Sequence, residues 1–295
     1  MKSVSDQNMA PLEALLCQLR ECLEEPHSHL LELFDAFADE ARYGRRLLAS
    51  SLRRLPRGAR ILEVGGGLML LSTALQCEGF EVTAVEPVGS GFSAFHELQA
   101  IVLAHAVACG HAPQVLRQRV EDIDLESQFD FAFSINVMEH VDDIDLTIRR
   151  VLEALRGTSA YRFTCPNYLF PYEPHFNILA LPSKALTGKL MRRWIDQSTR
   201  VYDREGMWAS LNWITVPRVR RAVRAIPCAR LQFHSEILSD ILERVVHDDR
   251  FAARRSLWIR RLVTLAVAVG MHRLLAKLPA SLLPVMDCSV ERVAT

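Results

Sequence analysis

The sequence predicts an α/β fold in which a doubly wound, mostly parallel sheet carries helices on both faces. An apolar run ends in the three glycines from Gly65 to Gly67 and resumes as an apolar helix. A second apolar run then ends at Glu86. Beyond it, amphipathic helical segments alternate with short apolar runs, which is the pattern of strands covered by helices.

Helical spacing dominates the chain before the first strand. Apolar residues recur at this spacing from Leu12 to Leu19 and from Leu30 to Phe37, and Pro26 separates the two segments. A third helix is expected over residues 41–55. Such helices can close over a bound ligand or pack against the sheet edge, and the sequence leaves both open.

The remaining elements are expected in alternation. Helix faces run from Phe95 to His105 and from Ile148 to Leu155, and a basic helix spans Val216 to Ala225. Strands are expected after the first two at 114–120, from 129, at 161–164, at 231–237 and at 285–294.

The glycine turn points to a nucleotide-like ligand. A ligand approaches backbone N–H groups closely only where no Cβ intervenes, and a tight strand-to-helix turn often needs a positive φ. Glu86 lies about 20 residues further on, where a carboxylate can accept the hydroxyls of a ribose. Dinucleotide enzymes place a third glycine where this chain has Leu70, which argues against them.

Three stretches carry a family resemblance. Glu63, Gly65 and Gly67 spell acid-x-G-x-G, residues 129–143 read FDFAFSINVMEHVDD, and residues 165–176 read CPNYLFPYEPHF. Together they resemble the class I S-adenosylmethionine-dependent methyltransferases over roughly residues 40–180, in the bacterial small-molecule and polysaccharide branch. The chain is more distantly similar to ubiquinone-pathway O-methyltransferases.

The resemblance implies a seven-stranded, mostly parallel, Rossmann-like sheet with an antiparallel pair of strands at one edge. It also implies N-terminal helices, helical insertions near the C-terminus and S-adenosylmethionine as cofactor. The expected divisions are an N-terminal helical segment (1–59), a cofactor-binding core (60–180) and the rest of the same domain with substrate-cap insertions (181–295). The implied cofactor contacts are Glu63, Gly65, Gly66, Gly67, Glu86, Glu121 and Asn136.

Two positions depart from the family pattern. Many relatives carry a fourth glycine where this chain has Met69, so the turn must close without it. Arg119 stands where relatives often have an aspartate that binds the adenine amino group. Glu121, Asp122 or backbone N–H groups near Val120 remain as alternatives.

Methyl transfer from a sulfonium requires alignment, a dry cavity and, for a hydroxyl acceptor, a proton acceptor. The loops after the fourth and fifth strands should supply that group, because ligands bind at the carboxyl ends of such strands. Histidines suit base catalysis near neutral pH, which favours His140 and His175 over Glu139 and Glu173. Glu139 and His140 can instead brace the loop beside the cofactor, and His175 can simply order its own loop.

No metal is expected. Ubiquinone-pathway relatives bind a divalent ion with a glutamate three residues before the Glu-His pair, and this chain has Asn136 there. His105 and His111 lack neighbouring carboxylates in the sequence.

The expected function is methyl transfer to a small molecule, or to a glycan or lipid-linked intermediate, at oxygen. An inactive cofactor-binding or scaffold protein of the same fold is the alternative, and an NAD-dependent oxidoreductase is disfavoured by Leu70. The oligomeric state is left open.

Charge and cysteine usage suggest compartment and partners. The formal net charge is zero, so no nucleic-acid partner is expected, and seven scattered cysteines without a C-x-x-C pair fit a cytoplasmic protein. Residues 184–277 hold 19 Lys and Arg against 8 Asp and Glu, with exposed-looking Trp194, Trp208, Trp213 and Trp258. Apolar and basic residues adjoin over 254–283, so peripheral contact with the inner membrane face is one interpretation and a core helix the other.

Overall fold

The computed structural model describes residues 9–87, 93–201, 203–247, 252, 257–271, 274 and 277–293. Seven strands form one hydrogen-bonded sheet in the order β3-β2-β1-β4-β5-β7-β6. The pairs β1–β2, β1–β4 and β2–β3 are parallel. The strand order reverses between β1 and β4, which confirms the doubly wound α/β fold. The strands are β1 (Arg60–Val64), β2 (Glu81–Val85), β3 (Gln114–Leu116), β4 (Phe129–Ile135), β5 (Leu155–Pro166), β6 (Ala229–Phe233) and β7 (Val285–Arg292).

The chain divides into two compact units. The first comprises 1–137, 146–161 and 291–295, and the second 138–145 and 162–290. The domain boundaries expected from sequence stay a prediction.

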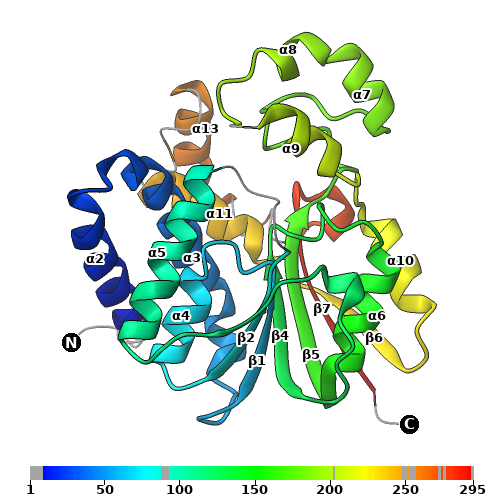
Figure 1. The fold of residues 1–295 in the computed structure, drawn as a ribbon. Helices are drawn as coiled ribbons and strands as arrows, with labels where there is room; N and C mark the ends of the chain where they lie inside the picture. Colours follow the sequence, from blue (N-terminus) through cyan, green and yellow to red (C-terminus); the bar gives the residue numbers. More distant parts are fainter. Residues whose placement is uncertain are drawn as a thin grey trace. The chain divides into compact units, whose positions relative to one another are not determined.

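The helical elements of the first unit are α2 (Ala10–Glu24), the 3₁₀ turn η1 (Ser28–Leu30), α3 (Leu31–Leu52), α4 (Leu70–Cys77), α5 (Ser93–Ala108), η2 (Val120–Asp122) and most of α6 (Ile144–Ala154). Figure 1 shows α2, α3, α4 and α5 beside β1 and β2. The apolar face of α2 is buried in a cluster that also contains Met69, Leu70 and Ala74 near α4 and Leu98 and Val102 of α5. Burial of such faces supplies most of the stabilisation of helices of this length.

The second and third predicted helices are one element, because α3 runs without a break from Leu31 to Leu52. No proline interrupts its apolar face, and Gly44 lies where α3 meets β4: a Cβ there would lie 2.5 Å from Ile135 Cδ1. At its other face, the buried Arg45 guanidinium forms two hydrogen bonds of 2.7 Å with the Glu78 carboxylate after α4. Packing and a paired buried charge therefore hold α3 against the sheet and against α4.

The second unit contains the predicted C-terminal insertions as short helices. They are α7 (Lys184–Leu190), α8 (Arg192–Asp196), α9 (Arg204–Ser210), α10 (Val216–Arg224), α11 (Ile237–His247), α13 (Leu257–Ala268) and η3 (Ala280–Leu282). Ser183, Asp203 and Thr215 each accept a backbone N–H three residues on, which starts α7, α9 and α10. Side-chain caps thus define the insertions that the sequence showed only as basic, Trp-bearing segments.

Several element limits differ from the predictions. The third strand ends at Leu116 and is followed by η2, whereas the fifth is much longer than 161–164. The sixth strand spans Ala229–Phe233 and so begins and ends earlier than the predicted 231–237. Directly after it, the His234 backbone N–H donates to the Asp287 carbonyl of β7. Strand limits are the least predictable feature because they depend on the neighbouring strand and not on local sequence.

Surface features of the second unit also correct the sequence interpretation. Leu262, Leu265 and Val269 are 58%, 61% and 62% exposed, so the core-helix interpretation is wrong for these residues. No helix within the described ranges combines the length and apolar character that a bilayer crossing needs. Of the seven cysteines, Cys165 and Cys288 are buried, while four are exposed.

Candidate functional site

The turn between β1 and α4 is built from left-handed backbone. Gly65 has a φ of 75° and Gly67 a φ of 53°, values that glycine adopts without penalty. Met69, where relatives have a fourth glycine, is also left-handed at 63° and immediately precedes α4. The turn therefore closes without a glycine at this position, through a methionine that is fully buried.

Two glycines of the turn are required by close packing. A Cβ on Gly65 would collide with the Val137 side chain. A Cβ on Gly66 would lie 2.6 Å from Met69 Sδ and 3.0 Å from Ala84 Cβ. Met69 thus fills the space under Gly66, and the backbone of the turn lies on the loop after β4 on one side and on β2 on the other.

The carboxylate of Glu86 is part of the turn. Its Oε2 accepts the N–H of Gly67 at 2.8 Å, across 19 positions of sequence. Burial raises the pKa of Glu86, and the Gly67 hydrogen bond and the charge of Arg117 act in the opposite direction. The acid at the end of β2 therefore lies beside the glycine turn, as the sequence predicts.

Glu63, at the other acidic position, is buried at the end of β1. Burial raises its pKa from 4.5 to about 8, an effect partly offset by the hydrogen bond that the Ser72 hydroxyl donates to it. At neutral pH the Glu63 side chain is therefore largely protonated, and β1 and α4 are joined through a neutral carboxyl group.

A polar chain that the sequence did not indicate completes the turn. Gln99 of α5 donates its amide N–H to the carbonyl of Gly67 at 2.5 Å, and Arg117 donates to Gln99 Oε1 at 2.7 Å. The backbone N–H and C=O of Gly67 are thus both engaged, the N–H by Glu86 and the C=O by Gln99. The only sequence signal is an amide on a helix face that otherwise carries apolar residues.

The alternatives for adenine recognition are separated by burial. Arg119 forms an ion pair with Asp122 at 2.9 Å, and both side chains are 53% exposed. Glu121 is buried in η2 between them in sequence. Asn136 is exposed, with a left-handed φ of 55°, directly after β4.

The candidate catalytic residues form a cluster in the second unit. One possible ligand atom from each of Glu139, His140 and His175 lies within 4.8 Å of the others. The two imidazole centroids are 5.4 Å apart, and Glu139 Oε1 lies 4.0 Å from His140 Nε2. Glu139 is fully buried. The structure therefore brings His175 beside the adjacent pair Glu139 and His140, 35 positions earlier in the sequence.

Glu173 and Ser210 orient the two rings. Glu173 Oε1 lies 2.6 Å from His175 Nδ1, and the same carboxylate accepts the N–H groups of His175 and Phe176. Ser210 Oγ lies 2.8 Å from His140 Nδ1 and donates its own hydrogen to the Met207 carbonyl. Sequence reasoning weighed Glu173 only as a base, and nothing in the sequence indicated Ser210.

Asn212 holds the loop that carries the Glu-His pair. Its side-chain amide donates to the carbonyls of Met138 and Val141 at 2.8 Å each, and its backbone N–H donates to the Glu139 carbonyl at 2.8 Å. The loop after β4 is thus fixed at three carbonyl groups by one residue of the insertion.

Aromatic residues adjoin this loop. The rings of Tyr168 and Trp213 stack at 4.2 Å, and Trp208 packs edge-on against both Trp213 and Phe176. The prediction of exposure is therefore wrong for Trp208 and Trp213, which are half-buried, and confirmed for Trp194, which is 58% exposed. The side chain of Trp258 lies outside the described residues.

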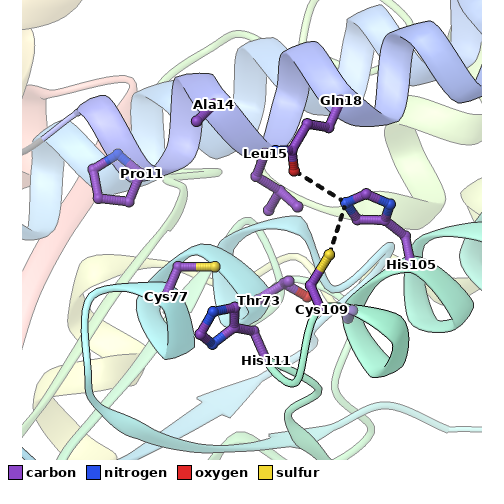
Figure 2. Close-up of a pocket in the computed structure, with 10 residues that line it drawn as sticks. Pro11, Ala14, Leu15, Gln18, Thr73, Cys77, His105, Cys109 and His111 are labelled. Carbon is purple, nitrogen blue, oxygen red and sulfur yellow. Dashed lines mark hydrogen bonds between the residues drawn. The ribbon is translucent and has the colours of Figure 1, made fainter.

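His105 and His111 line a different cavity, in the first unit. Both rings line a cavity of about 250 Å³ together with Cys77 and Cys109. Figure 2 shows these side chains between α2, α4 and α5. His105 Nε2 lies 3.3 Å from Gln18 Oε1 and 3.6 Å from Cys109 Sγ. No carboxylate lines this cavity.

Comparison with known proteins identifies the family. Residues 37–168 match the family described as a methyltransferase domain. An uncharacterized protein of Mycobacterium tuberculosis is 45% identical over 278 residues, which cover 94% of each chain. The ubiquinone biosynthesis O-methyltransferase of Xanthomonas axonopodis is 33% identical over 113 residues, covering 38% of this chain and 44% of the relative.

This chain belongs to the class I S-adenosylmethionine-dependent methyltransferases. Its cofactor is S-adenosylmethionine. Among solved structures, a methyltransferase from Mesorhizobium loti is 16% identical with a TM-score of 0.49, covering 83% of this chain and 97% of that chain.

The methyltransferase should lose cofactor binding when Gly65 is replaced by alanine, because the added Cβ collides with Val137 and moves the turn. Gly110→Ala is the matched control, since Gly110 has a φ of 72° and nothing lies within 4 Å of an added Cβ. Both variants should lose about 1–2 kcal/mol of stability from the left-handed backbone. Only Gly65→Ala should also weaken S-adenosylmethionine binding, by about tenfold or more in isothermal titration. Equal effects on affinity would show that the turn is not the binding element.

The raised pKa of Glu63 predicts a pH dependence of stability. The unfolded chain releases this proton near pH 4.5 and the folded protein only near 8, so the stabilisation is complete below 4.5 and is lost as pH rises to about 8. Relative to Glu63→Gln, the wild type should lose at most about 1.4 kcal/mol of unfolding free energy per pH unit in this window. Urea unfolding at several pH values measures it. Ser72→Ala removes a hydrogen bond that lowers the pKa of Glu63, so its pH window of declining stability should extend to higher pH. If the unfolding free energies of wild type and Glu63→Gln changed in parallel with pH, the raised pKa of Glu63 would be contradicted.

Proposed function

We propose that the enzyme transfers the methyl group of S-adenosylmethionine to an oxygen atom of a small molecule, or of a glycan or lipid-linked intermediate. The carbon–sulfur bond breaks, sulfur keeps the electron pair, and the acceptor oxygen forms the new bond to carbon as its proton leaves. The name of the ubiquinone biosynthesis O-methyltransferases similar to this chain supports oxygen as the acceptor atom.

The cofactor end of the site is assigned to the turn after β1. The N–H groups of Gly65, Gly66 and Gly67 would meet the amino-acid part of the cofactor, with Glu63 behind them. Glu86 would bind the ribose, exchanging its bond to the Gly67 N–H for cofactor hydroxyls. Burial of Glu121 beside the exposed Arg119–Asp122 pair supports Glu121 as the adenine partner, with Asn136 near the sulfonium.

One observation carries the acceptor end: the Glu173–His175 pair. A carboxylate 2.6 Å from Nδ1 keeps the hydrogen on that nitrogen, so the lone pair is on Nε2. The same carboxylate stabilises the imidazolium that forms when Nε2 accepts a proton. His175 is therefore the better placed proton acceptor.

His140 has a different character. Burial, followed by the neighbouring His175, lowers its pKa to about 4. The ring is neutral at physiological pH and its basicity is low, so it would bind and orient the acceptor hydroxyl more readily than it would take the proton. Glu139, behind it, would brace the pair.

The reaction is tested with purified protein, labelled S-adenosylmethionine and a panel of hydroxyl-bearing small molecules, sugar nucleotides and lipid extracts. His175→Ala should lower kcat on an identified acceptor by about 10²–10⁴ while leaving cofactor affinity unchanged. Glu86→Ala should abolish cofactor binding, and His105→Ala, in the separate cavity, should change neither. Tight cofactor binding without transfer to any hydroxyl would favour the scaffold alternative, and an N-methylated product would overturn the oxygen assignment.

We also propose peripheral contact with an anionic membrane through the exposed face of α13. Leu262 and Leu265 of α13 and Val269, directly after it, are exposed, and Arg260 and Arg261 precede them on the helix. Apolar side chains beside cations suit an interface with anionic lipid headgroups. Residues 254–256, also part of the predicted segment, lie outside the described residues.

Flotation with vesicles tests this contact. Binding to vesicles containing phosphatidylglycerol should exceed binding to neutral vesicles and should fall by about tenfold in Leu265→Glu. Val107→Glu is the matched control, because Val107 is 67% exposed on α5 of the first unit. Binding that is independent of anionic lipid, or equal in the two variants, would argue against the contact.

A further inference from the structure

The cluster of Glu139, His140 and His175 contains more than proton transfer requires. A general base needs one lone pair, yet three potential ligand atoms lie within 4.8 Å of one another in this part of the second unit. Two are imidazole nitrogens and one is a carboxylate oxygen. This donor set is typical of protein sites for divalent transition metals.

A chain of contacts through Ser210 favours one tautomer of His140. The Ser210 hydroxyl lies 2.9 Å from the Met207 carbonyl and 2.8 Å from His140 Nδ1. When its one hydrogen is donated to the carbonyl, Ser210 Oγ accepts from His140 Nδ1. In that tautomer His140 Nε2, the nitrogen that lies 4.0 Å from Glu139 Oε1, carries the lone pair.

His175 is oriented in the same way by a stronger acceptor. Glu173 takes the Nδ1 hydrogen at 2.6 Å and is itself fixed by two backbone N–H groups and by the Tyr168 hydroxyl. A carboxylate that holds the far nitrogen of a ligating histidine sets its tautomer and increases its donor strength. Glu173 would act as such an outer partner.

Hydrogen bonds and burial hold the backbone and the carboxyl group of the cluster in place. Asn212 fixes the backbone of residues 138–141 at three carbonyl groups, and Glu139 is fully buried. Ligands fixed in this way lose little conformational entropy when they bind an ion.

We propose that Glu139, His140 and His175 bind one divalent transition-metal ion, with Zn²⁺ the best match to two imidazole nitrogens and one carboxylate. The ligand atoms would draw together to about 3–3.5 Å of one another, as bond lengths of about 2.0–2.2 Å require. From the sequence no metal is expected, because Asn136 replaces an acidic ligand. The structure changes the argument, because His175 from the loop after β5 adds a nitrogen donor that no local motif revealed.

The inference rests on the proposed function and deepens it. An acceptor hydroxyl bound at the open position of the ion would have a lower pKa and would release its proton to solvent before the methyl group arrives. In the metal-loaded enzyme His140 and His175 would then be ligands and not proton acceptors. A lone pair on Nε2 cannot bind a metal ion and accept a proton at the same time. A direct measurement of metal binding therefore distinguishes the two roles.

The test uses the full-length protein, stripped with a chelator and titrated with Co²⁺ or Zn²⁺ without cofactor or acceptor. Cobalt should give the visible absorption of a site with nitrogen ligands at about one ion per chain, and Zn²⁺ should displace it while millimolar Mg²⁺ should not. His140→Ala, His175→Ala and Glu139→Gln should each weaken binding by about 100-fold or more, and Ser210→Ala by about tenfold. His105→Ala is the control and should bind as the wild type does.

Each outcome decides the proposal. Binding lost in His105→Ala, or unchanged in His140→Ala, would place the ion elsewhere and overturn it, as would the absence of the cobalt spectrum. Because Glu139 is buried, thermal unfolding is used to check that Glu139→Gln folds. If that variant does not fold, the His140→Ala and His175→Ala variants, at half-buried positions, test the site without it. Methyl transfer at full rate after chelation would support the proposed function and overturn the metal proposal. Metal binding at the cluster without any methyl transfer would support the metal proposal and overturn the proposed function.

Discussion

The hydrogen bond between the Gly67 N–H and the Glu86 carboxylate orders the glycine turn of the ligand-free protein. It joins the turn after β1 to the end of β2, so the two strands must be in register for it to form. Gln99 holds the carbonyl of the same residue. With both polar groups of this residue engaged, the left-handed turn is set before a ligand arrives, and ligand binding need not supply the free energy to order it.

The same constraint explains what the sequence could and could not predict about this end. Gly65, Gly67 and Glu86 are local signals, because a left-handed turn and a carboxylate at a strand end have few other uses. Met69 shows the limit. A methionine gives no indication of positive φ, and its left-handed conformation persists because its side chain fills the space under Gly66 and is fully buried. Tertiary packing thus offsets the conformational free energy that a left-handed backbone costs at a residue other than glycine.

At the cluster of Glu139, His140 and His175 the sequence predicts the three side chains but not their neighbours. Glu139, His140 and His175 follow from residue type and from their place after strands. Glu173 as an orienting group, Ser210 and Asn212 do not, because their partners are set by how an insertion of short helices returns to the loop after β4. Such contacts depend on the path of the chain, for which no periodicity or spacing exists. The merging of the second and third leading helices into α3 has a similar origin, since only the packing of Gly44 on Ile135 shows why the helix continues through that glycine.

The arrangement of hydrogens around the two histidines links these observations to chemistry. The Glu173 carboxylate can only accept, so it holds the hydrogen on His175 Nδ1 and leaves the lone pair on Nε2. The Ser210 hydroxyl favours the same arrangement in His140 when it donates its own hydrogen to Met207. Proton transfer would use one Nε2 lone pair, and hydrogen bonding to an acceptor hydroxyl would use the other. Glu139, fully buried beside the two rings, brings a third possible ligand atom within 4.8 Å of theirs. A bound cation would use all three atoms, whereas proton transfer to one imidazole nitrogen needs no third group.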